Sequence, residues 1–205
     1  MKELDLKLLN AMYNTKDGVR IRNSVVHSIQ SILSNKNVLM YGLVSPYLKS
    51  NVSSNDVQYI DYKDCNLDKR LPFADKKFDV IILSHLIEFT PYFREFIKDT
   101  LRVLKDDGTL VMIVANKGFQ RMKCRSTSEI MSFILRCNLL KIKEIVGVSC
   151  CLKIWPYEFH WRVSRYNYFL LPLMPFWADV TVVKLKKTEL EVVSTFVEDY
   201  GVVNV

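Results

Sequence analysis

Several side chains with chemical capacity stand where the sequence predicts that buried strands end. Ser84 and His85 follow the apolar run of residues 78–83, and Asp61 stands near the end of the strand-like run of residues 57–62. Imidazole exchanges protons near neutral pH, and a carboxylate accepts hydrogen bonds from hydroxyl groups. A lone histidine is also common as a structural residue, so both roles stay open for His85.

Other chemistries lack their sequence patterns. There is no Ser-His-Asp arrangement, no phosphate-binding glycine loop and no zinc-type ligand spacing. The cysteines have no C-x-x-C spacing and are odd in number, which indicates reduced thiols rather than a disulfide set. They are Cys65, Cys124, Cys137, Cys150 and Cys151.

Length and composition predict one domain. The chain has 205 residues, of which 49% are hydrophobic, enough for a sizeable core. No apolar run reaches the roughly 18 residues of a membrane span. The first residues are polar and charged where a signal peptide needs an apolar stretch, so a cytoplasmic protein is expected. The net charge of +7 allows an anionic partner without naming one.

The central unit is the stretch of residues 71–116. Residues 78–83 and 110–114 are short apolar runs, typical of parallel strands buried on both faces. Between them we expect a helix with Pro91 in its first turn and Asp107-Gly108 as its end. Its apolar stripe consists of Phe93, Phe96, Ile97, Leu101 and Leu104.

The rest of the chain continues this alternation of helices and strands. Helices are expected over residues 4–12 and 21–33, with a turn at 14–18, then near 45–48, and from Ser126 or Thr127 onward. Strands are expected at 38–43, 57–62, 142–151 and 178–185. This order predicts an α/β fold with a mostly parallel sheet and helices on both faces.

In such sheets, ligands bind beyond the carboxyl ends of the strands. Here those ends lie at Tyr41-Gly42-Leu43, Asp61, Ser84-His85 and Ala115-Asn116.

The motifs around the central unit resemble a known family. Leu71-Pro72-Phe73 followed by Phe78-Asp79, then Ser84-His85 with Glu88, then Arg102-Val103-Leu104-Lys105 before Gly108, resemble class I S-adenosylmethionine-dependent methyltransferases. Tyr13 and Gly18, with Tyr41-Gly42 and Ser45-Pro46-Tyr47-Leu48, resemble a bacterial subgroup with a rewritten glycine loop. The resemblance covers roughly residues 12–187.

The resemblance implies a Rossmann-like single domain over residues 1–205, with N-terminal helices at 1–36, a sheet core at 37–187 and a polar tail at 188–205. It implies S-adenosylmethionine as cofactor and methyl transfer to an unidentified acceptor. The implied cofactor contacts are Tyr41, Gly42, Leu43, Asp61, Asp64, Ser84 and His85. Methyl transfer needs a general base only for some acceptors, and His85 is the residue nominated for that role.

The sequence departs from the family in two places. Only Gly42 remains of the glycine-rich loop, and Met40-Tyr41 stand where an acid is usual. Residues 43–70 are too few for the full set of elements, so about one strand–helix unit is expected to be missing. Asp61 or Asp64 would hold the cofactor ribose, or each is an ordinary loop acid. The rival function is therefore a non-catalytic binding protein with a decayed cofactor loop.

Two further segments carry alternatives. The basic loop of Lys117, Arg121, Lys123 and Arg125 is either a solvated loop or a substrate contact for an acidic group, such as a lipid head group or a nucleic acid. The aromatic tract of residues 155–177 packs on the sheet, lies at a membrane surface, or covers an apolar substrate. A peripheral membrane or RNA-binding protein thus remains a third function.

If the basic loop meets a polyanion, binding to acidic liposomes or RNA should weaken steeply as salt rises, because each neutralised phosphate releases counterions. Replacing Lys117, Arg121, Lys123 and Arg125 by Gln should remove that binding. A sedimentation or filter-binding series in salt measures both effects. Binding that neither treatment changes would favour the solvated loop.

Overall fold

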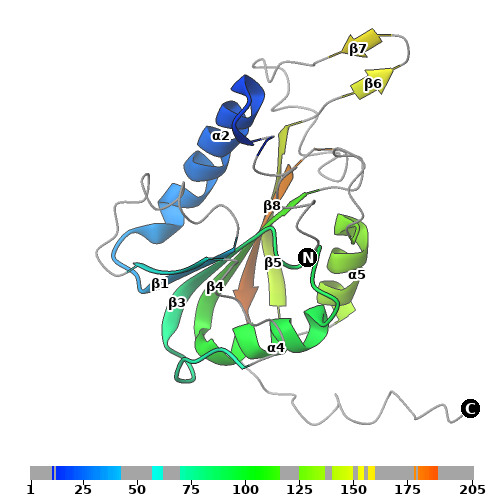
Figure 1. Ribbon diagram of the computed structural model, residues 1–205. Helices are drawn as coiled ribbons and strands as arrows, with labels where there is room; N and C mark the ends of the chain where they lie inside the picture. The colour runs from blue at the N-terminus through cyan, green and yellow to red at the C-terminus, as the bar shows by residue number, and fades with distance from the viewer. Residues whose placement is uncertain are drawn as a thin grey trace, which may run out of the picture.

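The computed structural model describes residues 11, 13–42, 57–61, 70–115, 125–136, 140–149, 152–154, 157–159, 178 and 180–188. Figure 1 shows a central sheet with helices on both sides. The elements in chain order are α2 (Lys16–Leu33), β1 (Val38–Gly42), β2 (Val57–Asp61), β3 (Phe78–Ser84), α4 (Phe93–Val103), β4 (Leu104–Ala115), α5 (Thr127–Arg136), β5 (Leu140–Ser149), β6 (Leu152–Ile154), β7 (Tyr157–Phe159) and β8 (Val180–Lys187).

The six-stranded sheet has the order β2-β1-β3-β4-β8-β5. Strands β2, β1, β3 and β4 are parallel neighbours, which confirms the prediction for the three most apolar runs. Strand β8 runs antiparallel to both β4 and β5, so the sheet is mixed but mostly parallel. The described residues between β1 and β3 contain the single strand β2, as expected for a shortened fold.

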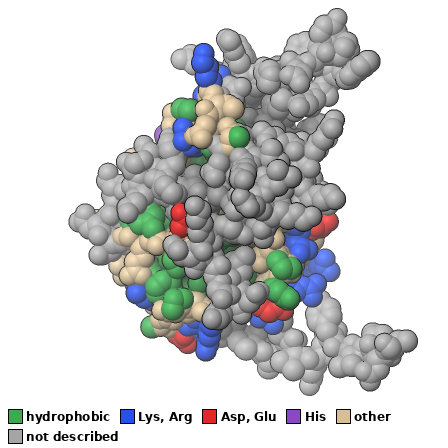
Figure 2. All heavy atoms as spheres, viewed as in Figure 1, with side chains coloured by type: hydrophobic (Ala, Val, Ile, Leu, Met, Phe, Trp, Pro, Cys, Tyr) green, Lys and Arg blue, Asp and Glu red, His purple; other side chains and the backbone are tan. Residues whose placement is uncertain are grey.

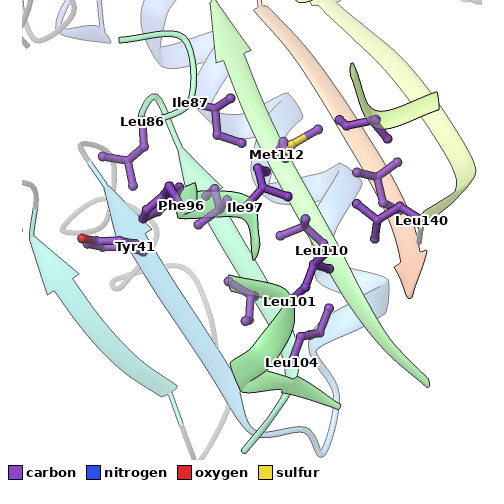
Figure 3. Close-up of a cluster of buried hydrophobic side chains, with 14 of the residues drawn as sticks. Tyr41, Leu86, Ile87, Phe96, Ile97, Leu101, Leu104, Leu110, Met112 and Leu140 are labelled. Atoms are coloured by element: carbon purple, nitrogen blue, oxygen red, sulfur yellow. The ribbon is translucent and has the colours of Figure 1, made fainter. Parts of the chain in front are cut away.

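Alternate residues of the central strands serve two separate cores. On one face, Leu39, Ile81 and Met112 pack with the buried side of α4 and α5. On the other, Met40 and Ile82 pack with the apolar stripe of α2. Figure 3 shows the α4 side, where labelled side chains of the strands lie with those of α4. The apolar runs that predicted these strands are thus explained by a sheet covered on both faces.

Helix α2 begins earlier than predicted. Thr15 is its N-cap, and the Thr15 Oγ1 accepts a hydrogen bond from the Gly18 N–H at 3.0 Å. The predicted turn at residues 14–18 is therefore wrong in its second half, which forms the first turn of the helix. Beyond the C-cap residue Ser34, Asn35 has φ 55°, a left-handed conformation that asparagine tolerates.

Helix α4 ends earlier than predicted. Its last residue is Val103, and Leu104 already pairs with Phe78 as the first residue of β4. Asp107-Gly108 is therefore no helix cap: both residues lie within β4, where the register with β3 shifts. Pro91 lies just before the N-cap residue Tyr92 rather than inside the first turn.

The remaining helix and strands follow the sequence closely. Ser126 and Glu129 form the reciprocal hydrogen bonds of a capping box at the start of α5. The strand predicted from residue 178 begins at Val180. The small β6–β7 sheet lies partly inside the aromatic tract and was not predicted. None of the helices in the described ranges has the length and apolar character needed to span a bilayer.

Surface charge is mixed where side chains are described. In Figure 2, acidic and basic side chains lie close together at the edges of the visible face, with hydrophobic ones between them. Helices α4 and α5 each carry an acid in the first turn and an arginine in the last turn, the arrangement that the helix dipole favours. Of the helix predicted at 4–12, residue 11 is described and is helical; the rest of it, the predicted helix near 45–48 and the tail from residue 189 lie outside the described residues.

Arg102, at the end of α4, holds the segment that precedes β3. Its guanidinium donates to the carbonyls of Leu71 and Phe73 at 3.0 and 2.9 Å. It also pairs with Asp99 at 2.7 Å and Asp75 at 2.6 Å. Burial would raise the pKa of Asp99, but hydrogen bonds from Arg102 and the Leu71 N–H outweigh it and lower that pKa. These contacts of Arg102 join the family-like Leu-Pro-Phe and Arg-Val-Leu motifs, and we call them the Arg102 clamp.

Gly42 closes β1 against β3. Its φ is +131°, and an added Cβ would lie 2.0 Å from the Ser84 carbonyl oxygen and 3.2 Å from Leu86 Cγ. A residue with a side chain is strained at this φ and clashes with the neighbouring backbone. The strands approach closely here because residue 42 is glycine.

We expect Arg102→Lys to lower the free energy of unfolding by about 1–3 kcal/mol, because a lysine cannot reproduce the forked set of bonds to two carbonyls and two carboxylates. Urea unfolding measures the change. Arg70→Lys is the matched control: Arg70 lies 3.5 Å from Asp99, but its side chain is largely exposed. Equal losses in the two variants would contradict the clamp.

We expect Gly42→Ala to destabilise the protein by at least about 2 kcal/mol, because it adds both backbone strain and a clash with β3. Thermal and urea unfolding measure this. Ser84→Ala is the control at the same contact, since it keeps the Ser84 carbonyl and removes a hydroxyl that has no hydrogen-bond partner. A Gly42→Ala variant as stable as the wild type would show that β1 and β3 can separate.

Candidate functional site at the carboxyl ends of the strands

The sheet register brings three predicted site residues into one row. Gly42 pairs with Asp61 of β2 on one side and with Ser84 of β3 on the other. Ser84 in turn pairs with Ile113 near the end of β4. The carboxyl ends of four strands therefore lie at nearly the same level, where a parallel sheet places its ligands.

The outer and inner parts of this row differ in burial. Asp61, on the edge strand, is partly exposed, whereas Ser84 is buried. The space beside Gly42 is filled by the Ser84 carbonyl rather than left open. Replacing Gly42 by a larger residue would therefore disturb the contact between β1 and β3 itself. A loss of cofactor binding in such a variant would not show that the cofactor contacts Gly42.

His85 turns the chain out of β3. It has φ 52°, and its N–H donates to the Ile113 carbonyl of β4 at 2.9 Å. The imidazole is fully buried. Non-glycine residues in this region of backbone space are uncommon, although histidine is enriched there, and they concentrate at functional sites. The backbone thus directs the histidine inward at the end of the sheet.

Both ring nitrogens of His85 have partners. Nδ1 lies 2.9 Å from Oε1 of Glu88, and Nε2 lies 2.5 Å from the hydroxyl of Tyr13. The tyrosine and imidazole rings are tilted at 55° with centroids 5.5 Å apart. These three residues form a buried chain of hydrogen bonds, which we call the Tyr13–His85–Glu88 chain.

Glu88 joins this chain to the end of β4. Its Oε1 also accepts from the Ala115 N–H at 2.9 Å, and its carbonyl accepts from the Arg125 N–H at 2.8 Å. Its side chain is fully buried, and the second oxygen, Oε2, has no hydrogen-bond partner. A buried carboxylate is costly unless its oxygens are bonded, so this half-satisfied group marks an unusual place in the core.

Tyr13 is a helical residue just before the turn that leads into α2. Its side chain is buried with the apolar stripe of that helix. Burial raises the pKa of the Tyr13 hydroxyl well above its ordinary value, and the negative charge of Glu88 raises it further, against a smaller lowering by Arg22. The hydroxyl is therefore held protonated and available as a donor.

Other predicted site residues are placed differently. The Tyr41 side chain lies in the α4-side core, with its ring 5.5 Å from that of Phe96, so only its backbone faces the row (Figure 3). Arg125 of the basic loop stacks its guanidinium 4.3 Å from the Phe93 ring. A charge-removal test of the loop is therefore best confined to its other three cations. Leu43, Asp64, Lys117 and Arg121 lie outside the described residues.

Sequence reasoning placed His85 at the row but missed its partners. The spacing of three residues between His85 and Glu88 was a usable signal, because one turn of chain brings such side chains together. Tyr13 gave no comparable local signal, because it lies 72 residues from His85. Within the described ranges, no group of histidines, cysteines and acids is arranged to hold a metal ion.

Comparison with known proteins agrees with the fold. Residues 37–112 match the model of a family described as a methyltransferase domain. A search of curated proteins finds no match. Many solved structures share the fold at low sequence identity.

A SAM-dependent methyltransferase from Aquifex aeolicus has a TM-score of 0.57 at 11% identity, covering 92% of this chain and 100% of its own. An S-adenosylmethionine-dependent methyltransferase from Mesorhizobium loti has a TM-score of 0.53 at 9% identity, covering 82% of this chain and 98% of its own. The [4+2]-cyclase SpnF has a TM-score of 0.50 at 13% identity, covering 82% and 80%. Residues 37–112 thus match a methyltransferase domain, and the chain has the Rossmann-like α/β fold of S-adenosylmethionine-dependent methyltransferases.

Proposed function

We propose that this protein is an S-adenosylmethionine-dependent methyltransferase whose cofactor binds across the carboxyl ends of β1, β2 and β3. The observation that carries the proposal is the row of Asp61, Gly42 and Ser84, set in register within the part of the chain that matches a methyltransferase domain. The cofactor supplies an activated methyl group on a sulfonium, so the protein's task is alignment of the acceptor and exclusion of water.

The chemistry of the row fits the adenosine half of the cofactor. Asp61 ends the edge strand β2, is partly exposed, and carries a carboxylate that can accept from two ribose hydroxyls. Ser84 adds a buried hydroxyl without a hydrogen-bond partner. Asp64 remains the alternative acid. The amino acid half of the cofactor would lie over the turn that follows Gly42.

The rival function is a non-catalytic binding protein that has kept the fold. One observation favours it: the space that glycine leaves at residue 42 is taken up by the Ser84 carbonyl. The fold does not choose between these functions, because one matched structure of this fold is a cyclase. Cofactor binding and a methylated product are therefore separate questions.

Calorimetric titration with S-adenosylmethionine and S-adenosylhomocysteine tests the proposal. We expect saturable binding, and we expect Asp61→Asn to weaken it by about 1–3 kcal/mol, or about one to two orders of magnitude, because a charge-assisted bond to the ribose is lost. Asp64→Asn tests the alternative acid in the same way.

Asp107→Asn is the matched control, because Asp107 is an exposed acid in the register shift of β4, toward the opposite end of the sheet. If the wild-type protein binds neither ligand at millimolar concentration, the non-catalytic binding protein is the better explanation. Equal weakening in Asp61→Asn and Asp107→Asn would remove Asp61 from the site.

A further inference from the structure

The Tyr13–His85–Glu88 chain has a fixed direction of hydrogen bonding. An ionised carboxylate only accepts, so Nδ1 of His85 carries the hydrogen that Glu88 Oε1 receives. In the neutral imidazole, Nε2 then has a lone pair, and the Tyr13 O–H donates to it. The arrangement is a phenol hydroxyl on the basic nitrogen of an imidazole that a carboxylate orients.

That arrangement has the geometry of a general base with a hydroxyl nucleophile in place. A base must lie within about 2.6–3.2 Å of the oxygen whose proton it takes, and a third group usually fixes its ring. The Tyr13 hydroxyl lies at 2.5 Å, just below the short end of this range, and Glu88 is fixed in turn by the Ala115 N–H. The protein's own phenol thus stands where an external hydroxyl would be activated.

Tyr13 is a helical residue that lies outside α2, so its departure need not unwind that helix. It precedes the N-cap Thr15, whose bond to the Gly18 N–H keeps α2 intact on its own. The space it would vacate is lined by the apolar side chains of the α2-side core, including Ile21 and Val25. An apolar space with one basic nitrogen at its end suits an aromatic ring that bears a hydroxyl.

Among the described residues, the residue before His85 and the residue that bonds to its Nδ1 each have a buried polar atom without a hydrogen-bond partner. They are Glu88 Oε2 and Ser84 Oγ, in residues that are 3% and 2% exposed. A core that served only stability would be expected to satisfy or omit them. Their presence beside His85 is a second sign that this place is built for a ligand rather than for packing alone.

We propose that His85 is the general base for a phenolic methyl acceptor, that Glu88 is its positioning residue, and that Tyr13 holds the acceptor's place until the acceptor arrives. This inference rests on the proposed function. In the transfer, the acceptor's oxygen forms a bond to the methyl carbon while sulfur departs with the electron pair of the old bond. The phenolic proton passes to Nε2 of His85. The products are a methyl ether, S-adenosylhomocysteine and a proton.

A phenol fits better than the other common acceptors. A carboxylic acid is already ionised at neutral pH, needs no base, and would bring a second negative charge close to Glu88. A phenol is almost wholly protonated at that pH, so a general base is needed to remove its proton. The residue that now occupies the place is itself a phenol with its ring against the imidazole.

A matched set of acceptors tests the substrate class. Wild-type protein with S-adenosylmethionine is incubated with p-cresol, p-toluidine or p-toluate, and methylated products are measured by mass spectrometry. We expect product from p-cresol and little from the other two. His85→Gln should lower kcat for p-cresol about 100-fold or more while calorimetric cofactor affinity stays within about twofold. Preferred methylation of p-toluidine or p-toluate, or an unchanged kcat in His85→Gln, overturns the inference.

The role of Glu88 has its own signature. Glu88→Gln keeps an acceptor for the Nδ1 hydrogen but removes the charge that stabilises a protonated imidazole. We expect kcat for p-cresol to fall at least about tenfold with KM within about twofold. A change confined to KM or to thermal stability would show that Glu88 serves packing alone.

A measurement without turnover separates this inference from the proposed function. In Tyr13→Ala labelled with ¹⁵N-histidine, p-cresol should shift the Nε2 resonance of His85, whereas toluene, which has the same ring without a hydroxyl, should not. In Tyr92→Ala, a change at an exposed tyrosine, p-cresol should act on the His85 resonance as it does in the wild type, where Tyr13 still competes for Nε2. Failure of S-adenosylmethionine to bind the wild type would remove the proposed function, while this spectrum would still decide whether His85 receives a phenol.

Tyr13→Phe covers the case in which Tyr13→Ala does not fold. It keeps the ring and removes the bond to Nε2, so p-cresol should bind about two- to tenfold more tightly than to the wild type. Tyr92→Phe is its control and should bind as the wild type does. A folded Tyr13 variant in which p-cresol neither moves the His85 resonance nor binds more tightly than to the wild type overturns the inference.

Discussion

The structure depends on one constraint: β1, β3 and β4 are buried on both faces and must therefore keep one register and be covered by helices on each side. Their side chains alternate between the α4-side and α2-side cores, so a slip of one residue would exchange the two cores. That register also sets Gly42, Asp61 and Ser84 in one row. The alignment of the candidate site is thus a consequence of core packing.

Two of the motifs that carry the family resemblance, Leu71-Pro72-Phe73 with Phe78-Asp79 and Arg102-Val103-Leu104-Lys105, make structural contacts away from that row. Arg102 ties the segment before β3 to the end of α4, and Asp79 accepts from the Asn37 N–H while it pairs with Lys105. These contacts lie near the amino ends of the strands, opposite the row. These two motifs therefore indicate how the chain folds, and they are compatible with any reaction that this fold supports.

The sequence predicted those features that depend on a local pattern of residues. It did not predict those that depend on contacts between segments far apart in the chain. Apolar runs predicted the parallel strands, and the residue after β3 was placed correctly at the row. The end of α4 was misplaced because Leu104 fits the helical stripe as well as it fits a strand, and pairing with Phe78 decides between them. The antiparallel run of β8 and the contact of Tyr13 with His85 both depend on chain segments that meet only in the folded protein.

The energetic cost of the Tyr13–His85–Glu88 chain bears on why it exists. Replacing a buried, hydrogen-bonded polar group by an apolar one of similar shape is often neutral or stabilising, so stability alone gives little reason for a carboxylate in a core. Here one carboxylate oxygen is bonded twice and the other not at all. The clamp around Arg102 shows the opposite case, in which both Asp99 oxygens are bonded and the contacts hold two segments together. A polar group that costs stability yet orients the buried imidazole at the row is better explained by what His85 does to a bound hydroxyl than by what it adds to the fold.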